Sequence, residues 1–511
     1  MLVRSFCRRA LGLAFLVCVA TAPAAAQEPP LPETAAMPLQ AHLERIVSRE
    51  NEDWGILAWS LEREQPLFAV NPNRVMIPAS NNKVFTAVWA LAVLGPDYRF
   101  RTELLRGGPI ESGVLRGDVY LRGSGDPAFG YPAYDKDPMQ PLRTMARQLR
   151  ARGVRVVEGD VVGDASVFDT ARFGPEWPRD TGNGASTYAP TVSGLPFQRN
   201  LLWVRAVPAG RQVSIQLDPP ITEIPVQSSV RLGGRRAWAV RQPGSDTIEV
   251  KGAVSGRGPF RFGVGVAVPE LMTAAALRQA LLQEGIEVRG EAKLGPTPRD
   301  AVPVHRHYSI RLAEMIPRLN RDSDNFFAEH LWKAAAAKAT GKGSYPRGGP
   351  ASANFFIHRA GVPYGQVYQA DGSGLSAYNR ASAYSLVRAL IYAHAQPWSE
   401  GFHHSLAVAA SGDGTLRNLF RGSAAANNLH AKTGYIRGVR TLSGYVTARN
   451  GETIVFSFLY NGRNTSGARG IQQQLGTLLA DYGDPGPTPA ARPQPPQPRA
   501  APQRGGARAR N

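Results

Sequence analysis

Apolar and polar residues follow different patterns along successive parts of the chain. Trp54–Leu61 and Leu67–Val70 are short apolar runs joined by a charged turn, a pattern that predicts two strands. Asn81–Leu94 carries its apolar residues at helical spacing and ends at Gly95-Pro96, a pair that stops helices. We therefore expect a strand pair followed by a buried helix.

From residue 102 to residue 302 the chain changes to short β-rich runs broken by glycine and proline. Two amphipathic helices are predicted within this part, over Pro141–Arg152 and Pro269–Glu284. We expect a β-rich inserted region over 102–302 that comprises two subdomains. Its predicted strands include Gly117–Arg122, Val154–Val162, Leu201–Val207, Gln212–Leu217 and Thr247–Val254.

After the inserted region the pattern is helical from His305 to about Ala339 and again over Ala381–Ala395, and three apolar-rich segments then predict strands. Asn450-Gly451 is a strong hairpin signal between the last two of these strands. Strands from both ends of the chain, surrounded by helices, indicate an α/β core with a mostly antiparallel sheet, built from residues 27–101 and 303–483. The remaining segments expected here are helices over Ile310–Leu319 and Phe326–Lys338, strands over Ala431–Ile436, Arg440–Ala448 and Glu452–Asn461, and a last helix over Ala468–Tyr482.

The two ends of the chain differ from the rest in composition. Residues 1–26 begin with arginines, continue as the apolar run Ala10–Ala20 and end in small residues, which predicts a cleaved signal peptide. The tail Asp484–Asn511 is rich in proline and arginine and is expected to be disordered. Since no later run reaches the roughly 18 apolar residues of a membrane span, we expect a soluble protein that lies outside the cytoplasm and has no transmembrane anchor. Both cysteines, Cys7 and Cys18, lie in the predicted signal peptide.

The chain has 511 residues and a formal net charge of +19, to which both ends contribute. Such a surface fits nucleic acid, an anionic membrane or an acidic polymer, and export disfavours nucleic acid. Only eight of the 59 basic residues are lysines. Because an ammonium group can lose its proton near neutral pH and a guanidinium cannot, a lysine within a motif indicates chemistry beyond charge.

The first candidate motif is Ser80-Asn81-Asn82-Lys83, at the start of the predicted buried helix. A serine hydroxyl needs a nearby base to act as a nucleophile, and a desolvated lysine can serve. The start of a helix also offers free backbone N–H groups to a developing oxyanion. The alternative is a helix-capping serine beside a lysine whose amine reaches solvent. The largely apolar helix argues against that alternative.

The second candidate is Ser323-Asp324-Asn325, in a polar turn between two predicted helices. Ser-x-Asn is a weak pattern, because Ser80-x-Asn82 and Ser352-x-Asn354 also match it. Any one of them could be a helix cap or an Asx turn. We prefer Ser323 because a polar interhelical turn can present side chains to a cleft.

The third candidate is Lys432-Thr433-Gly434, in the first strand of the final sheet. Glycine in a strand allows another backbone to approach closely. Lysine and threonine beside it can bind a carboxylate, and the strand edge can pair with a peptide. The alternative is a surface strand with a glycine at a twist.

In this order, the three motifs resemble those of the penicillin-recognising serine acyltransferases, which are DD-peptidases and serine β-lactamases. Ser80 lies 243 residues before Ser323, which lies 109 residues before Lys432. The long first interval resembles the D-alanyl-D-alanine carboxypeptidase/endopeptidase family, the class C low-molecular-mass penicillin-binding proteins. The resemblance covers residues 40–483 and includes Gly123-Ser124-Gly125-Asp126-Pro127, Gly159-Asp160-Val161-Val162-Gly163-Asp164, Asp371-Gly372-Ser373-Gly374-Leu375-Ser376 and Gly412-Asp413-Gly414-Thr415-Leu416.

The resemblance implies a serine β-lactamase/DD-peptidase-like core that cleaves D-Ala-D-Ala ends or D-Ala cross-links of peptidoglycan stem peptides. It implies an acyl-enzyme, inhibition by β-lactams and no cofactor. Ser80 would be the nucleophile and Lys83 its base, while Ser323 would relay a proton to the leaving amine. The other implied roles are peptide binding by Asn325, carboxylate binding by Lys432 and Thr433 beside Gly434, an oxyanion hole from the N–H groups of Ser80 and Tyr435, and a contact of Asp164 with the amino group of a diaminopimelate-like side chain.

Two positions depart from the family pattern. The residue after Lys-Thr-Gly is usually Ser or Thr but is Tyr435 here, so a hydroxyl contact to substrate is expected to be lost while the N–H remains. The family usually has Arg where this chain has Ala377, with Arg380 close by. This second change concerns recognition of the stem peptide's side-chain carboxylate and leaves the catalytic residues intact.

Two other functions remain open from the sequence. A serine β-lactamase has the same core, although hydrolysis of a small molecule does not need the long insertion. A catalytically silent peptidoglycan-binding protein could use the basic surface and tail, although it has no use for the deprotonatable amine of Lys83. The histidines, including His403-His404, lack metal-ligand spacing, and no metal is expected.

Overall fold

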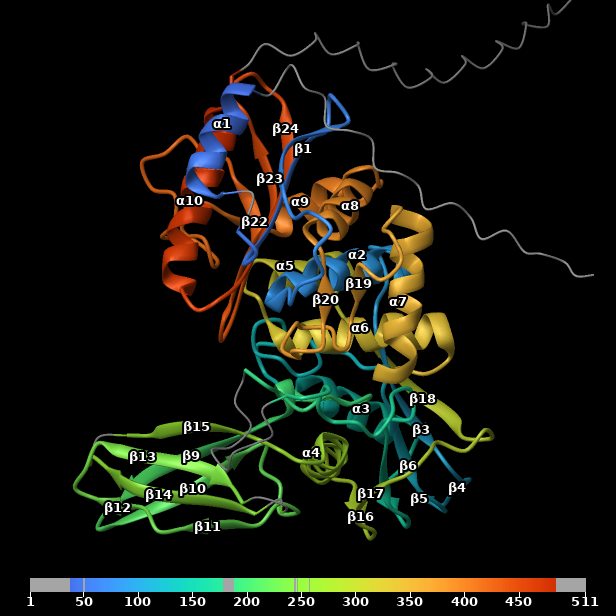
Figure 1. The fold of residues 1–511 in the computed structure, drawn as a ribbon. Helices are drawn as coiled ribbons and strands as arrows, with labels where there is room; N and C mark the ends of the chain where they lie inside the picture. The colour runs from blue at the N-terminus through green and yellow to red at the C-terminus, as the bar shows by residue number, and fades with distance from the viewer. Residues whose placement is uncertain are drawn as a thin grey trace, which may run out of the picture.

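The computed structural model describes residues 37–48, 51–177, 188–242, 245, 247–256 and 258–483. The predicted signal peptide (1–26) and tail (484–511) lie outside these residues. In the described ranges, no helix is long and apolar enough to cross a membrane. Figure 1 shows one end of the molecule built around a sheet, a helical middle, and a β-rich region at the opposite end.

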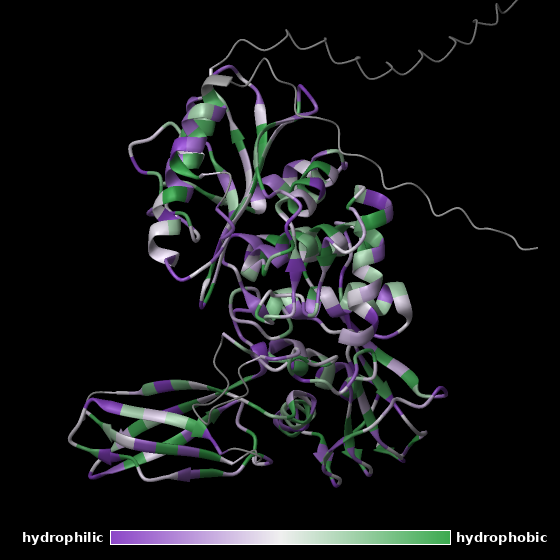
Figure 2. Cartoon of the chain, in the orientation of Figure 1, coloured by the Kyte–Doolittle hydropathy of each residue, from purple (hydrophilic) through white to green (hydrophobic). Residues whose placement is uncertain are grey.

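The sheet at the first of these ends is antiparallel and has six strands in the order β2-β1-β24-β23-β22-β21. Strands from both ends of the described chain therefore lie side by side in it. The central strands are buried on both faces because helices cover each side. Figure 2 accordingly shows mostly hydrophobic residues along them. The strands are β1 (Trp54–Ser60), β2 (Gln65–Val70), β21 (Ala407–Val408), β22 (His430–Ile436), β23 (Val439–Thr447) and β24 (Thr453–Asn461).

Helices α1 (Met37–Ile46) and α10 (Thr465–Asp481) pack against one face of this sheet (Figure 1). The other face meets a helical layer in which α2, the predicted buried helix, contacts α5, α6 and α8. Trp89 of α2 packs edge-on against Trp332 of α6, with ring centroids 5.8 Å apart. The layer comprises α2 (Asn82–Leu94), α5 (Leu312–Asn320), α6 (Asn325–Thr340), α7 (Tyr345–Ala360), α8 (Ala383–His394) and α9 (Ser399–Ser405), with the short strands β19 (Val367–Tyr368) and β20 (Arg380–Ala381).

In the described part of the region between α2 and α5, the strands form four sheets. Two of them, β17-β8-β6-β3-β18 and β16-β7-β5-β4, lie beside α3 and α4 (Figure 1). Their elements are β3 (Arg101–Arg106), β4 (Ile110–Glu111), β5 (Val114–Leu115), β6 (Val119–Arg122), α3 (Gln140–Ala151), β7 (Val156–Val157), β8 (Val161–Asp164), α4 (Pro269–Gln283), β16 (Glu287–Val288), β17 (Ala292–Leu294) and β18 (Val302–Tyr308).

The other two sheets of this region face each other at the lower left of Figure 1. Their strands alternate between hydrophobic and hydrophilic residues (Figure 2), as expected when one face packs and the other meets water. They contain β9 (Leu201–Ala209), β10 (Gln212–Asp218) and β15 (Phe260–Gly265) in one sheet and β11 (Val226–Ser228), β12 (Arg231–Leu232), β13 (Arg236–Arg241) and β14 (Ile248–Val254) in the other, after a short 3₁₀ turn at Gln198–Asn200.

The first and last strands of this region pair with each other. β3 and β18 are antiparallel, with Arg101 opposite Tyr308, so the chain enters and leaves the region at adjacent points. The predicted boundaries at residues 102 and 302 and the division into two subdomains stay predictions.

Two expectations about local structure were wrong. Helix was predicted from His305, but Val302–Tyr308 forms β18, where alternate exposure and pairing with β3 favour a strand. The helix begins only at Leu312, after a capping box between Arg311 and Glu314. The run predicted as one strand over Val154–Val162 forms two, because its first part pairs with β5 in one sheet and its second part pairs with β6 in another.

Candidate active site

Ser80 and Lys83 lie at the junction of a 3₁₀ turn (Ala79–Asn81) and helix α2. Lys83 Nζ is 3.0 Å from Ser80 Oγ, within hydrogen-bond distance. Ala79 has φ +46°, a left-handed conformation that costs an L-residue energy and brings Ser80 into a sharp turn. The predicted serine–lysine pair is therefore formed.

The Lys83 ammonium group is completely buried, and polar groups surround it. It donates hydrogen bonds to Asn325 Oδ1 and to the carbonyl oxygen of Ser373, both at 2.6 Å. Burial lowers the pKa of Lys83 to about 8, although the carboxylates of Asp371 and Glu329 oppose that shift. An amine with this pKa is partly neutral near neutral pH and can accept a proton.

Two buried carboxyl groups lie behind this lysine. Glu329 accepts hydrogen bonds from the N–H groups of Ser373 and Gly372, at 2.7 and 3.2 Å. Asp371 accepts from the N–H groups of Gly374 and Ser376, at 2.7 Å each. Burial and the charge of Asp371 raise the pKa of Glu329 to about 7. The two carboxyl groups hold the segment after Asp371 against the start of α2.

Sequence reasoning gave these two carboxyl groups no role. Asp371 belongs to a run quoted for the family resemblance, and that run was the only signal for it. Glu329 follows Asn325 by four residues on α6, which places both on one face of the helix. Since this spacing is common, it could not single out Glu329.

Ser323 occupies the turn before α6 in a left-handed conformation, with φ +58°. Its hydroxyl accepts a hydrogen bond from Lys432 Nζ at 2.8 Å, and the same ammonium group donates to the carbonyl oxygen of Thr433 at 2.7 Å. Lys432 is completely buried. Burial, and then the charge of Lys83, lower its pKa well below the usual value. The three predicted motifs therefore meet in one place.

Strand β22 lies directly against the turn that carries Ser80. Asn81 Nδ2 donates to the carbonyl oxygen of Lys432 at 2.9 Å. A side chain at Gly434 would place its first carbon 2.0 Å from Thr441 Oγ1 on the neighbouring strand, and 3.1 Å from both Ser80 N and the carbonyl oxygen of Pro78. Only glycine allows the two backbones to approach this closely.

A cavity of about 540 Å³ opens in front of Ser80. Among the described residues, its lining contains no acidic side chain and neither of the two buried lysines. Tyr435 lines it and is 54% exposed. The remaining lining residues are Tyr188, Ser323, Asn325, Gly414, Thr415, Arg417, Asn418, Leu419, Thr433, Gly434, Arg440 and Arg469.

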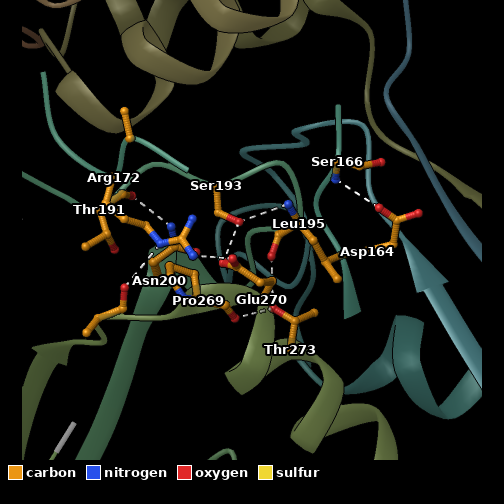
Figure 3. Close-up of polar contacts among 12 residues, drawn as sticks. Asp164, Ser166, Arg172, Thr191, Ser193, Leu195, Asn200, Pro269, Glu270 and Thr273 are labelled. Atoms are coloured by element: carbon orange, nitrogen blue, oxygen red, sulfur yellow. Dashed lines mark hydrogen bonds and ion pairs between the residues drawn. The ribbon is translucent and has the colours of Figure 1, made fainter. Parts of the chain in front are cut away.

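The region between β3 and β18 also contributes to this site. The carbonyl oxygen of Tyr188 accepts a hydrogen bond from Asn325 Nδ2 at 2.6 Å. Arg199 forms a two-point ion pair with Asp324, the middle residue of the second motif. Figure 3 shows how the segment between these residues is held, since Ser193 Oγ donates to Glu270 of α4 at 3.0 Å.

Comparison with known proteins identifies the family to which this chain belongs. The model of the D-Ala-D-Ala carboxypeptidase 3 (S13) family matches residues 36–482. The chain belongs to this family. It is 31% identical over 447 residues to a D-alanyl-D-alanine carboxypeptidase of Actinomadura sp. strain R39, covering 84% of this chain and 81% of that relative. It is 25% identical over 430 residues to carboxypeptidase DacB of Haemophilus influenzae, covering 81% and 87% of the two chains.

A solved structure shows the same fold. The crystal structure of penicillin-binding protein 4 from Haemophilus influenzae superimposes with a TM-score of 0.72 at 24% identity, over 86% of this chain and 99% of that chain. A second structure of that protein holds a β-lactam. The predicted family and the DD-peptidase-like fold class are confirmed.

The two departures from the family pattern take the following form. Tyr435 stands at the cavity with its ring stacked under the Arg440 guanidinium, 4.4 Å from ring centroid to Cζ. Ala377 is exposed, and Arg380 donates to the carbonyl oxygens of Ala377 and Asn379. Neither Ala377 nor Arg380 lines the Ser80 cavity.

Asp164 is not brought to the Ser80 cavity. It ends β8, is almost fully buried, and accepts hydrogen bonds from the N–H groups of Ser166 (Figure 3) and Thr297, at 2.9 and 2.8 Å. These hydrogen bonds lower the pKa of Asp164 against the opposing effect of burial. The Asp164 carboxylate therefore already accepts hydrogen bonds from two backbone N–H groups. Its contact with a substrate amino group stays a prediction. Within the described ranges, no group of three or more His, Cys, Asp or Glu residues could hold a metal ion.

Proposed function

We propose that the cavity in front of Ser80 is the active site of a serine DD-peptidase that acts on peptidoglycan stem peptides. The chain is a hydrolase of the D-Ala-D-Ala carboxypeptidase family, and this proposal assigns the reaction to particular residues. The observation that carries it is the hydrogen bond of 3.0 Å between Lys83 Nζ, with its lowered pKa, and Ser80 Oγ. This pair supplies a nucleophile and a matched base at one cavity.

In the proposed reaction, neutral Lys83 takes the proton of the Ser80 hydroxyl as Oγ attacks the carbonyl carbon of the penultimate D-Ala. The N–H groups of Ser80 and Tyr435 stabilise the oxyanion. The C–N bond then breaks and the leaving amine receives a proton through Ser323, whose hydroxyl Lys432 holds. Water hydrolyses the resulting ester, which frees Ser80 and releases the shortened peptide.

Asn325 and the 432–434 segment would position the substrate. Asn325 uses its oxygen to accept from Lys83 and its Nδ2 to donate to Tyr188, so its amide plane is fixed. Thr433 donates to Thr415 Oγ1 at 2.8 Å and lines the cavity beside Ser80. The edge of β22 can pair with an extended peptide. We assign substrate binding to these residues.

We also propose that the enzyme works in the periplasm, after removal of residues 1–26. The composition of those residues and the polymeric, acidic nature of peptidoglycan support this location. The net charge of +19 falls by only three when residues 1–26 are removed, so the remaining chain still attracts an acidic polymer. β-Lactams would act as inhibitors by acylating Ser80. A complex of the related penicillin-binding protein 4 with a β-lactam supports this assignment.

Peptide hydrolysis tests the proposal. A soluble peptide ending in D-Ala-D-Ala and a D-Ala cross-linked dimer should each be offered to the purified protein without residues 1–26. We expect release of D-Ala or of the separated peptides by the wild type and none by Ser80→Ala. Failure of a folded wild type to cleave either peptide would contradict the proposal and favour the silent peptidoglycan-binding protein.

A further inference from the structure

Among the described residues, three arginines line the Ser80 cavity, and they come from three different elements. Arg417 lies in the loop between β21 and β22, Arg440 on β23 and Arg469 on α10. Elsewhere in the described chain, many arginines pair with a carboxylate, as Arg199 does with Asp324. None of the three cavity arginines forms an ion pair within the described ranges, and no acidic residue there lines the cavity with them.

Arg440 is the most enclosed of the three. Its guanidinium carbon lies 4.4 Å from the ring centroid of Tyr435, and its Nε is buried without a hydrogen-bond partner in the described chain. Burial, and then the charge of Arg469, lower the pKa of Arg440. A buried N–H donor without a hydrogen-bond partner and two neighbouring positive charges both raise the free energy of the site. An anion bound between Arg440 and Arg469 would lower both contributions.

The motif lysine cannot supply the accessible positive charge at this end of the cavity. Lys432 is completely buried, donates to Ser323 and Thr433, and is absent from the cavity lining. A guanidinium, by contrast, stays charged and offers parallel N–H groups that match a carboxylate.

The arginines lie on the side of the cavity assigned to the leaving group. Thr433 lines the main cavity and also a small neighbouring cavity, which Arg440 and Arg469 line as well. Thr433 directly follows Lys432, which holds Ser323, the residue that we assign to the leaving amine. A carboxylate on the leaving amino acid would therefore be directed toward Arg440.

We propose that Arg440, assisted by Arg417 and Arg469, forms the subsite for the carboxylate of the leaving amino acid. In this chain, position 435 is tyrosine and the usual Ser or Thr hydroxyl is absent. The arginines take over the contact with the carboxylate that this hydroxyl would make. Tyr435 then acts as the platform on which the guanidinium stacks. This inference rests on the proposed function and names a specificity-determining residue for it.

Two peptides with the same acyl part test this subsite. One ends in D-Ala-D-Ala with a free carboxylate and the other in D-Ala-D-alaninamide, so they differ only at the group in question. The quantity to measure is the ratio of their kcat/KM values. We expect the wild type to prefer the acid by about ten- to hundredfold, the range for a hydrogen bond to a charged group. Arg440→Gln should remove most of that preference, and Arg440→Lys should keep part of it.

Further variants make the result unambiguous. Arg437→Gln is the matched control, because Arg437 is exposed, lies in the same hairpin as Arg440 and does not line the cavity. The ratio of kcat/KM values for the two peptides should be the same in this variant as in the wild type. Arg469→Gln, on an exposed helix position, should lower the ratio even if Arg440→Gln fails to fold. An unchanged ratio in both folded variants would overturn the inference, as would an equal loss on both peptides. If the wild type cleaved neither peptide, the proposed function itself would fail.

Discussion

Lys432 Nζ lies 2.8 Å from Ser323 Oγ, so the proposed active site contains a second serine–lysine hydrogen bond beside the one between Ser80 and Lys83. The surroundings of the two lysines differ. The carboxylates of Asp371 and Glu329 raise the pKa of Lys83 against the effect of burial, whereas burial and Lys83 both lower the pKa of Lys432. Lys83 thus keeps a pKa near the working pH of a general base.

Substitution of each lysine by arginine separates base catalysis from charge. Guanidinium stays protonated at any workable pH, so Lys83→Arg should lower the acylation rate by at least about 10³-fold. Lys432→Arg should be milder if its role is to hold Ser323. The rates can be measured with a chromogenic β-lactam, and circular dichroism checks the fold.

Lys338→Arg, at an exposed position of α6, is the control and should leave the rate unchanged. Equal and mild losses for Lys83→Arg and Lys432→Arg would remove the case for Lys83 as the base.

The pKa of Lys83 predicts a pH profile. Only the neutral amine accepts the Ser80 proton, and with a pKa of about 8 the neutral fraction falls about tenfold for each pH unit below that value. The acylation rate should therefore rise from pH 6 to pH 8 and level off above it. A profile that is flat over this range, measured with a substrate that does not itself titrate, would show that the proton does not pass to Lys83.

Gly434→Ala tests the close contact between β22 and the Ser80 turn. The added methyl group would lie 2.0 Å from Thr441 Oγ1, whose hydroxyl donates to the carbonyl oxygen of Pro78, and 3.1 Å from Ser80 N and from that carbonyl oxygen. Since these contacts are relieved only when β22 shifts relative to Thr441 and the Ser80 turn, we expect a loss of acylation rate on the order of 10²-fold. Gly401→Ala, where nothing lies near the added carbon, should react like the wild type. Full activity of Gly434→Ala would mean that the turn tolerates displacement.

Arg199 is predicted to act as a positioning residue through Asp324. Its ion pair with Asp324 fixes the turn that carries Ser323 and Asn325. Arg199→Gln should lower kcat by about tenfold with a smaller change in KM, because Asn325 and Ser323 lose their alignment, and Arg199→Lys should restore part of the rate. Arg205→Gln, at an exposed position of β9, is the control. A lower melting temperature with unchanged kcat would assign Arg199 to stability alone.

The sequence predicted the elements that carry the motifs because local patterns determine them. The helix after Ser80 and the strand with Lys432 differ from their expected bounds by one residue, since apolar spacing and turn residues mark their ends. The strand at Val302–Tyr308 was missed because its pairing with β3 joins residues about two hundred positions apart. No local pattern reports such a pairing.

The same reason explains which site residues were missed. Glu329 and Arg199 act through contacts with distant segments, and Arg440 gains its place from the register that sets it opposite Tyr435. Asp164 was selected from its position in a family-like run, yet its hydrogen bonds are to its own turn region and to Thr297. Motif spacing indicates which candidate residues meet at the cavity, whereas the residues that hold them in place are set by contacts between distant segments.

Reaction with penicillin tests the central claim most directly. The β-lactam ring opens without losing atoms, so intact-mass analysis should show one added penicillin mass, and peptide mapping should place it on Ser80. We predict an adduct that lasts for minutes or longer in the wild type and is absent from folded Ser80→Ala. Rapid multiple turnover of penicillin would instead indicate a β-lactamase, and labelling that persists in Ser80→Ala would contradict the assignment of Ser80 as the nucleophile.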